Sequence, residues 1–294
     1  MTELPKKALP GHIAAALAGA GGTTDSAGQA WAGRDLPAQE MYHNFDADDG
    51  AMDSAFAAAV AELAAGNGTE AAVVASLAHA RVFIPIVAQL AEQTVGENGL
   101  VSDKESDMAL VTLQGPDGRR ALPAFSHADA LTRWHPEARP VAVYAARAAL
   151  SAVAEEAQLM VVDPGSQRPF VLRRPALWAL AQQNDWLPSY ADPAVAEVLE
   201  RSVDDLGHPA VVAISASAGQ GIQSHWDTDT EPSGRLVSGG GTGPELCVTL
   251  TLLPGLDQSA VNGVLEHLQN FWAGNEVFAH AVDSVQLRLR HQQT

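Results

Sequence analysis

The sequence predicts a mixed fold of the α+β and α/β type: an N-terminal domain with a mixed β-sheet and packed helices, and a smaller two-layer α+β C-terminal domain. Three patterns predict it. Apolar runs flank the turn Gly115-Pro116-Asp117-Gly118, which is typical of a hairpin. Two apolar strands enclose a helical stretch between Pro140 and Asp163. Alternating apolar residues over 246–253 and 285–290 enclose an amphipathic helix.

The length of 294 residues exceeds the usual single-domain size of roughly 100 to 150 and favours two domains. Residues 1–50 combine glycine pairs, polar turns and an acidic stretch, which predicts an N-terminal arm. We expect Trp31 to dock this arm on the body. Prolines at 188 and 193 separate a first domain, 51–187, from a second, 193–294.

In the first domain, Ala-rich helices over 52–65 and 69–79 are separated by the helix-stop signal Gly66-Asn67-Gly68. The apolar run 81–87 predicts a strand, and Pro85 predicts an edge or bulge position, because proline donates no ladder hydrogen bond. The remaining elements are hairpin strands 108–113 and 120–125, a helix over 128–134, strands 140–144 and 159–163 joined by a helix over 145–156, strand 170–172, and a helix over 175–183. Right-handed crossover geometry predicts that strands 140–144 and 159–163 are parallel neighbours or near neighbours.

In the second domain, the pattern predicts a helix over 194–203 and a strand over 210–215. Residues 219–243 are polar and glycine-rich, which predicts a flexible connector. Apolar residues at helical spacing over 261–272 predict a helix that covers the apolar side of the C-terminal sheet.

Composition excludes several classes of protein. The net charge of −18 repels phosphate backbones, so nucleic-acid binding is not expected. Cys247 is the only cysteine, which excludes an intrachain disulfide and fits a reducing cytoplasm. No run approaches the 18 or so apolar residues that span a bilayer, and Pro10 interrupts the apolar N-terminal stretch, so neither a membrane span nor a signal peptide is expected.

Three groups of residues are candidates for chemistry. Ser217 follows an apolar strand before Gly219, as in a nucleophile elbow, although Ser215 replaces the first glycine of that motif and a polar loop is the simpler interpretation. His225, Asp227 and Asp229 alternate along an extended segment and could offer metal ligands, at a spacing that matches no established site. Arg168, Arg173 and Arg174 could grip a carboxylate or phosphate.

Trp226 lies beside His225 in the predicted loop and is the best candidate for an exposed partner contact, with Trp31 as a second. Cys247 has no positive neighbour in sequence, so we expect it to pack rather than react. No motif for a cofactor is present.

The order of segments in the first domain resembles the SseB family: the run MALVTLQGPDGRRALPAF, Trp134-His135-Pro136, then QLMVVDPG and RPFVLRRPALWAL. Residues 253–257 and 283–285 resemble the C-terminal SseB region, and GGTTDSAG with Trp31-Ala32-Gly33-Arg34 resembles actinobacterial-type members. The family carries no agreed activity, so the resemblance transfers no catalytic residue.

We therefore expect a non-enzymatic cytoplasmic protein that acts as a protein-interaction or regulatory module, without a cofactor and with another protein as partner; self-association stays open. The alternatives are a hydrolase that uses Ser217 or a metal near His225, and a sensor of amino acids or small anions that uses Arg168, Arg173 and Arg174.

Overall fold

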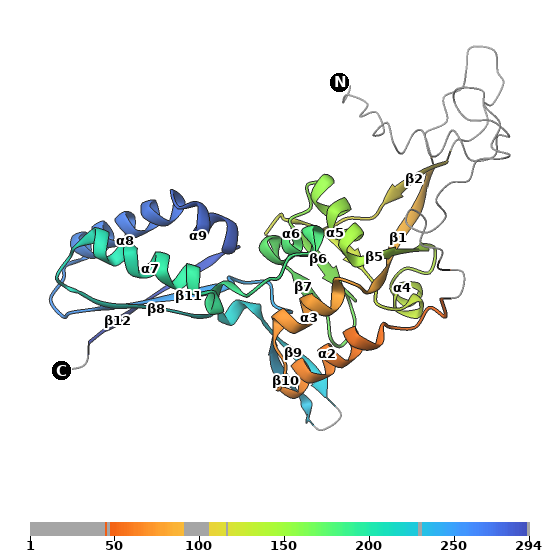
Figure 1. The fold of residues 1–294 in the computed structure, drawn as a ribbon, viewed down its shortest axis with the longest axis horizontal. Helices are drawn as coiled ribbons and strands as arrows, with labels where there is room; N and C mark the ends of the chain where they lie inside the picture. The colour runs from red at the N-terminus through yellow and green to blue at the C-terminus, as the bar shows by residue number, and fades with distance from the viewer. Residues whose placement is uncertain (1–44, 46–47, 91–105, 116, 229–230, 293–294) are drawn as a thin grey trace, which may run out of the picture. The chain divides into compact units, whose positions relative to one another are not determined.

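The computed structural model describes residues 45, 48–90, 106–115, 117–228 and 231–292 (Figure 1). The chain divides into two compact units, residues 1–48 and 49–294. Every helix and strand described below belongs to the second unit. Nearly all of the predicted arm, including Trp31, lies outside the described residues.

The helices α2 (Ser54–Ala65) and α3 (Glu70–Leu77) begin and end where local signals predict. The Asp53 carboxylate accepts hydrogen bonds from the backbone nitrogens of Ala55 and Phe56 and caps the start of α2. Gly66 ends α2 in the left-handed conformation, at φ 80°. The Thr69 hydroxyl then accepts from Ala72 N at the start of α3.

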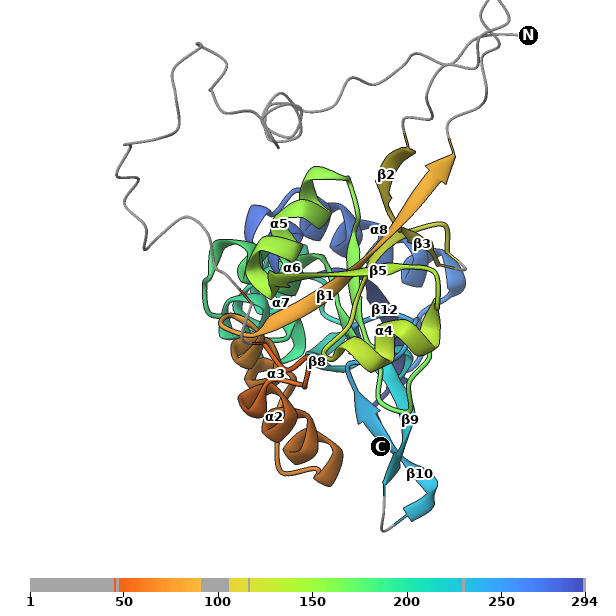
Figure 2. The ribbon, with the colours of Figure 1, turned by 90° about the vertical axis from the view of Figure 1, so that its right-hand side faces the viewer.

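The first sheet has the order β2-β1-β5 and is antiparallel throughout; its strands are β1 (Arg81–Leu90), β2 (Ser106–Leu110) and β5 (Arg139–Tyr144) (Figure 2). The prediction that Pro85 lies at an edge or bulge is wrong, because β1 is the central strand. Pro85 pairs with Pro140 of β5, and the side of Pro85 that has no N–H group faces away from β5. On that side, β1 pairs first with Phe125 and then, further along the strand, with β2. On that side the Pro85 carbonyl still accepts from Val111 N.

The second sheet is mixed and has the order β3-β4-β6-β7; its strands are β3 (Leu113–Gln114), β4 (Arg120–Ala124), β6 (Leu159–Val162) and β7 (Phe170–Leu172). β4 pairs with β3 as the predicted hairpin and with β6 in parallel. The predicted first hairpin strand, 108–113, is divided, because residues up to Leu110 pair with β1 and only Leu113 and Gln114 pair with β4.

Strands 140–144 and 159–163, predicted as parallel neighbours or near neighbours, lie in different sheets. β5 pairs with β1 in the first sheet, whereas β6 pairs with β4 in the second. Backbone bonds from Gln158 N to Arg120 O and from Asp163 N to Ala124 O extend the β4–β6 ladder at both ends. The helices of this half are α4 (Ala128–Trp134), α5 (Ala145–Ala154) and α6 (Arg174–Gln182), close to their predicted bounds.

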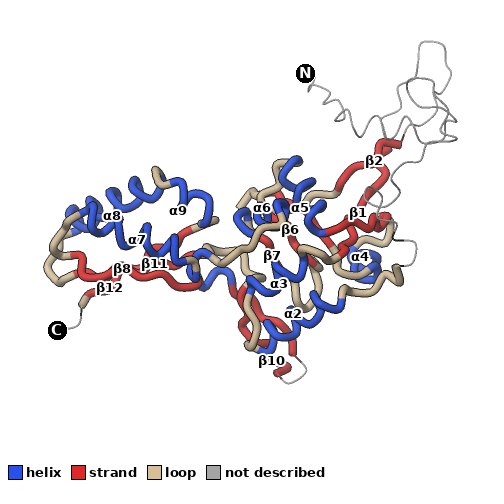
Figure 3. Tube along the Cα trace, viewed as in Figure 1, coloured by secondary structure: helices blue, strands red, loops and turns tan. Residues whose placement is uncertain are grey.

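The C-terminal sheet has the order β12-β11-β8, and its helices lie on one side of it (Figure 3). β11 pairs with β8 antiparallel and with β12 in parallel. Val195 and Val198 of α7, Val264 and Leu268 of α8 and alternate residues of β11 form one core, as the two-layer prediction requires. The elements are the 3₁₀ turn η1 (Ser189–Ala191), α7 (Pro193–Leu206), β8 (Val211–Ala218), β11 (Leu246–Leu252), α8 (Gln258–Ala273), α9 (Glu276–Ala281) and β12 (Val285–His291).

The glycine-rich segment 219–243 is not a loose connector. It forms the turn η2 (Gln220–Ile222) and a hairpin of β9 (Gln223–Thr228) and β10 (Glu231–Ser238). Its glycines allow close backbone packing, because a Cβ on Gly221 would lie 2.6 Å from the carbonyl carbon of Gly243. The nitrogens of residues 239, 240 and 241 all donate to the Ile222 carbonyl, at 2.9 to 3.1 Å.

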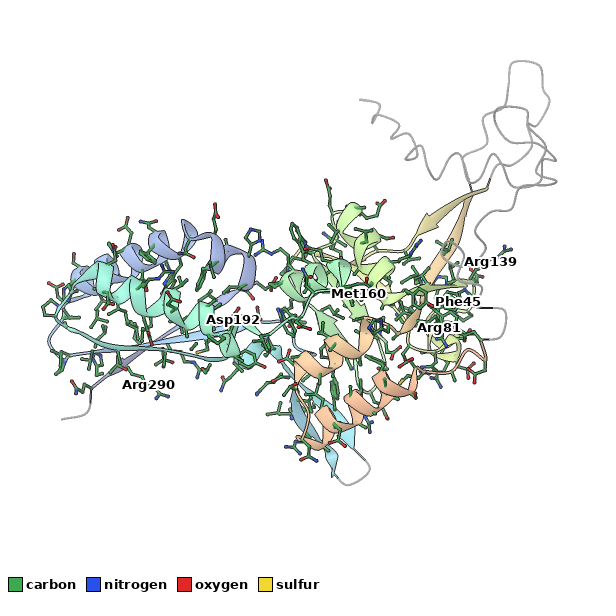
Figure 4. All side chains as sticks on the ribbon, in the orientation of Figure 1. Phe45, Arg81, Arg139, Met160, Asp192 and Arg290 are labelled. Carbon is green, nitrogen blue, oxygen red and sulfur yellow. The ribbon has the colours of Figure 1, made fainter. Side chains whose placement is uncertain are left out.

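The larger core joins both N-terminal sheets to α2, α3, α5 and α6, and Met160 lies fully buried within it (Figure 4). Trp226 of β9 and Val237 of β10 belong to the same core. The fold is of the predicted α+β class. The predicted domain boundary at residues 187–193, where η1 lies, stays a prediction. No helix in the described ranges is long and apolar enough to cross a membrane.

Candidate functional site

A cavity of 720 Å³ lies between the start of α2, α4 and the turn after β6. Its lining combines apolar and polar residues. The apolar residues are Met52, Phe56, Ala57, Val60, Ala130 and Trp134, and the polar residues are His127, Arg133, Asp163, Ser166, Gln167 and Arg168, with Pro164 and Gly165 in the same turn.

Local interactions place α2 beside α4. The Asp53 cap starts α2 so that Phe56 and Val60 turn into the core, where they are 3% and 8% exposed. Ahead of the helix, the Gly50 carbonyl accepts from Ala128 N, the first residue of α4. The apolar part of the lining therefore comes from segments that are fixed to each other by backbone bonds.

The turn Asp163-Pro164-Gly165 contributes to the polar part of the lining. Asp163 has a positive φ of 52°, which is rare for a residue other than glycine, and Gly165 has a φ of 78°. The Asp163 carbonyl accepts from Ser166 N over 3.1 Å and closes the turn. The Asp163 carboxylate accepts from Ser126 N over 2.8 Å and from the Ser126 hydroxyl over 2.6 Å. This residue thereby joins the end of β6 to the segment that follows β4.

A chain of hydrogen bonds continues from Asp163 to Arg133. Because a carboxylate has no proton to donate, the Ser126 hydroxyl donates to Asp163 and accepts from His127 Nδ1, 3.0 Å away. His127 Nε2 is then free to accept from Arg133 Nη2, at 3.3 Å. The order Arg133, His127, Ser126, Asp163 fixes His127 as the tautomer protonated at Nδ1.

This chain of hydrogen bonds differs from the one in which a serine nucleophile donates its proton to a histidine base. Ser126 is 2% exposed and its proton is bound to a carboxylate rather than to the histidine. The arrangement orients Arg133 instead. Arg133 is exposed, and within the described ranges it has no carboxylate partner. Guanidinium groups of Arg133 and Arg168 on one lining can bind a carboxylate or phosphate through paired hydrogen bonds.

Comparison with family models identifies the part of the chain that carries this cavity. Residues 56–179 match the model described as the SseB protein N-terminal domain. This part of the chain is an SseB N-terminal domain. The match contains α4, the turn at Asp163 and most of the cavity lining. No curated protein and no solved structure matches the chain in the corresponding searches.

The three arginines that the sequence offered as a ligand group separate within the SseB fold. Arg168 lines the cavity. Arg173 is buried, lies 3.3 Å from Asp283 Oδ2 and donates to the Gly241 carbonyl. Arg174 donates to the carbonyls of Ala279 and Val282. The prediction of a shared site is wrong, because Arg173 and Arg174 bind the chain beyond the SseB domain.

Ser217 is not at a nucleophile elbow. It lies inside β8, which continues to Ala218, whereas the elbow requires a sharp turn after the strand. Its hydroxyl is 3.4 Å from the Cys247 carbonyl, the one partner it has among the described residues. Cys247 is buried, as expected.

The metal candidates lie on or beside β9. His225 is exposed on this strand, the side chain of Asp227 and all of Asp229 lie outside the described residues, and the part of the chain that is described contains no group of three metal-ligating side chains.

The prediction of Trp226 as an exposed contact is wrong, because it is completely buried. Side chains alternate along β9, so Trp226 points to the opposite face from its exposed neighbour His225 and packs in the core of the SseB domain. The segment Gln223–Thr228 has no apolar alternation that could have indicated this strand, because Trp226 is its one apolar residue. Trp31 lies outside the described residues.

A buried polar cluster joins the SseB domain to the C-terminal half, and no motif in the sequence indicates it. Tyr190 of η1 donates a 2.6 Å hydrogen bond to Glu70 of α3. Burial raises the pKa of Glu70, the Tyr190 bond opposes that rise, and the nearby Glu245 carboxylate adds to it. Burial and the Glu70 charge likewise raise the pKa of Tyr190.

Glu245 and Asp283 continue the cluster. Glu245 accepts from Ser189 N at 3.2 Å and from Asp283 N at 3.1 Å, and burial raises the pKa of its carboxyl group. The Asp283 carboxylate accepts from Arg119 at 2.9 Å and from Arg173 at 3.3 Å. Each buried charge has a partner, as a stable interface requires. We interpret the cluster as the contact that orients the two halves.

Proposed function

We propose that this protein is a non-enzymatic regulatory module whose SseB domain binds a small organic anion. The observation that carries the proposal is the cavity between α2, α4 and the Asp163 turn. Its lining contains the basic or titratable side chains of Arg133, Arg168 and His127 together with the aromatic rings of Phe56 and Trp134.

The lining suits a ligand with an anionic head and a short apolar body. A volume of 720 Å³ is within the range of roughly 300 to 1,000 Å³ for small-molecule sites. In a chain with a net charge of −18, arginines gathered on one lining oppose the overall field and attract an anion locally. Amino acids and small carboxylates or phosphates fit this chemistry.

Binding accounts for the described geometry better than catalysis does. The Ser126 hydroxyl donates to Asp163, and the Ser217 hydroxyl reaches only a backbone carbonyl among the residues described. Ser126 is buried and donates its proton to Asp163 rather than to the neighbouring His127, and Ser217 has no adjacent base among the described residues, whereas a nucleophile needs a base to take its proton. A hydrolase that uses Ser217 or a metal near His225 remains the alternative. Activity that is lost in Ser217→Ala or His225→Ala would support it.

We also propose that the module works in the cytoplasm with another protein as its partner. The single buried cysteine needs no oxidising compartment.

Thermal unfolding with a ligand panel tests the proposal. A ligand that binds only the native state raises its stability by about 2.7 kcal/mol at 100 times its Kd. The panel contains serine, glutamate, succinate, citrate, pyruvate and phosphate, each at millimolar concentration and constant ionic strength. We expect at least one to raise the Tm of the wild type.

Arg133→Gln removes the cavity guanidinium, and Arg147→Gln removes a guanidinium from the exposed surface of α5, so the two variants have the same net charge. The shift should be lost in Arg133→Gln and kept in Arg147→Gln. No shift across the panel, or an equal shift in both variants, would overturn the proposed site.

A further inference from the structure

The C-terminal sheet has two edge strands that differ in charge. β12 carries Arg288, Arg290 and His291, and Figure 4 shows Arg290 on the side of the strands away from the helices. Charged side chains of this kind protect a strand edge against pairing with another chain. β8, at the other edge, has the sequence VVAISASA, with neither a charge nor a proline over eight residues. β8 therefore lacks the usual protection.

The backbone of β8 is available for pairing. In an antiparallel ladder, alternate residues direct both backbone groups to the partner strand. Gly219 N donates to Glu245 O over 2.7 Å, which sets the alternation along β8. The backbone N–H and C=O groups of Ser215 and Ser217 therefore point to β11. Those of Ile214 and Ala216 point outward, away from the sheet. Within the described ranges no backbone group accepts or donates a bond on that outer side of Ile214 or Ala216.

The surroundings of this edge are apolar and acidic. Val212 is 44% exposed on β8 itself. α7 packs with β8 and exposes Glu197, Glu200 and Asp204 to solvent. A strand added to β8 would therefore lie next to a helix with acidic side chains, in a chain of net charge −18.

We propose that the edge of β8 binds an extended, basic segment of a partner protein, which adds a strand to the C-terminal sheet. Main-chain hydrogen bonds to Ile214 and Ala216 give affinity, and lysine or arginine side chains complement the carboxylates of α7. A second copy of this chain fits less well, because pairing of two β8 strands would bring two acidic α7 helices together.

Binding of designed peptides to the full-length protein tests this surface. The probe is a fluorescent nine-residue peptide of alternating lysine and valine. One control has the same sequence with alternate backbone nitrogens methylated, and the other has glutamate in place of lysine. We expect the lysine peptide to bind at least tenfold more tightly than either control in fluorescence anisotropy. Equal binding of the methylated peptide would mean charge attraction without strand addition and would overturn the proposal.

Variants at Val212 locate the binding site. Val212→Glu should tighten binding of the lysine peptide several-fold, and Val212→Lys should weaken it by a similar factor. Leu236→Lys adds the same charge at another exposed position, on β10, and should leave binding unchanged. Equal affinities of the Val212→Glu and Val212→Lys proteins would contradict the proposal.

Sedimentation equilibrium distinguishes the partner from a second copy. A wild-type dimer that is weakened by both Val212→Glu and Val212→Lys would identify another copy of the chain as the occupant and would overturn the proposal. A protein that stays monomeric and binds the lysine peptide supports it.

Discussion

Asp163 holds Ser126 by two hydrogen bonds, 2.8 Å from the backbone nitrogen and 2.6 Å from the hydroxyl, although the two residues are 37 positions apart. This pair explains the positive φ of Asp163, since the turn directs its carboxylate back onto the segment after β4. It also anchors the chain of bonds through His127 to Arg133, and with it the polar part of the cavity lining.

Replacement of Asp163 by asparagine should destabilise the protein by about 1–3 kcal/mol, because an amide can accept only one of the two bonds from Ser126 and leaves a buried donor unpaired. Asparagine tolerates the left-handed backbone, so strain does not contribute. Urea unfolding measures the change. Glu137→Gln on the exposed surface should alter stability by less than about 0.5 kcal/mol, and equal effects of the two variants would refute the account.

Replacement of Tyr190 by phenylalanine should destabilise the protein more at pH 8 than at pH 4.5. The pKa of Glu70 is raised above its usual 4.5 in the folded state, so the stability linked to this group is fully present below the unfolded pKa and is lost as pH rises through the folded pKa. The Tyr190 bond stabilises the charged form and limits that loss. Without it, we expect an additional cost of about 1–3 kcal/mol at pH 8.

Glu70→Gln provides the control for Tyr190→Phe. The glutamine oxygen still accepts from Tyr190 but does not titrate, so the pH dependence that Glu70 contributes should disappear. Stability curves from pH 4.5 to 8 for both single variants and the double variant measure this. An effect of Tyr190→Phe that does not vary with pH would contradict the assignment.

Alanine at Gly221 should destabilise the protein, whereas alanine at Gly263 should stabilise it. A Cβ at Gly221 would meet the backbone of Gly243, and one at Gly263, inside α8, would meet no atom within 4 Å. The helix propensity of alanine predicts a gain of about 0.5–1 kcal/mol at Gly263. Thermal unfolding of the two variants measures the difference, and a neutral Gly221→Ala would show that the turn is looser than the structure describes.

Replacement of Trp226 by alanine should cost about 3–5 kcal/mol, because the side chain is fully buried in the core of the SseB domain. Trp178, which is 44% exposed on α6, provides the matched control, and Trp178→Ala should cost much less. Chemical denaturation compares the two. Similar stabilities would instead favour Trp226 as a surface residue.

Local signals predicted most helices and strands outside the segment 219–243, whereas the pairing of the strands depended on contacts between distant residues. Asp53, Gly66 and Pro175 mark helix ends through contacts within a few residues, so the helices were predictable. The strand that pairs with β5 was not predictable, because the apolar pattern of β5 is equally compatible with pairing to β1 or to β6. The prediction for Trp226 failed because glycines around it indicated a flexible loop, although they serve close backbone packing.

The candidate site was predictable only in part. Arg168 was a candidate ligand residue in the sequence, and the strand before the turn was predicted to end at Asp163. His127, Arg133 and Ser126 carry no motif in the sequence, and they become a site only when β4 and β6 pair and bring Ser126 to Asp163. The cluster of Glu70, Tyr190 and Glu245 likewise depends on the contact between the two halves.

Isothermal titration calorimetry tests the central claim most directly. The panel ligand that gives the largest thermal shift is titrated into wild-type protein, Arg133→Gln and Arg147→Gln at two salt concentrations. The account predicts one site per chain, affinity that falls with salt, a loss of at least tenfold in Arg133→Gln and wild-type affinity in Arg147→Gln. Equal affinity in all three proteins, or the absence of measurable heat with every ligand, would contradict it.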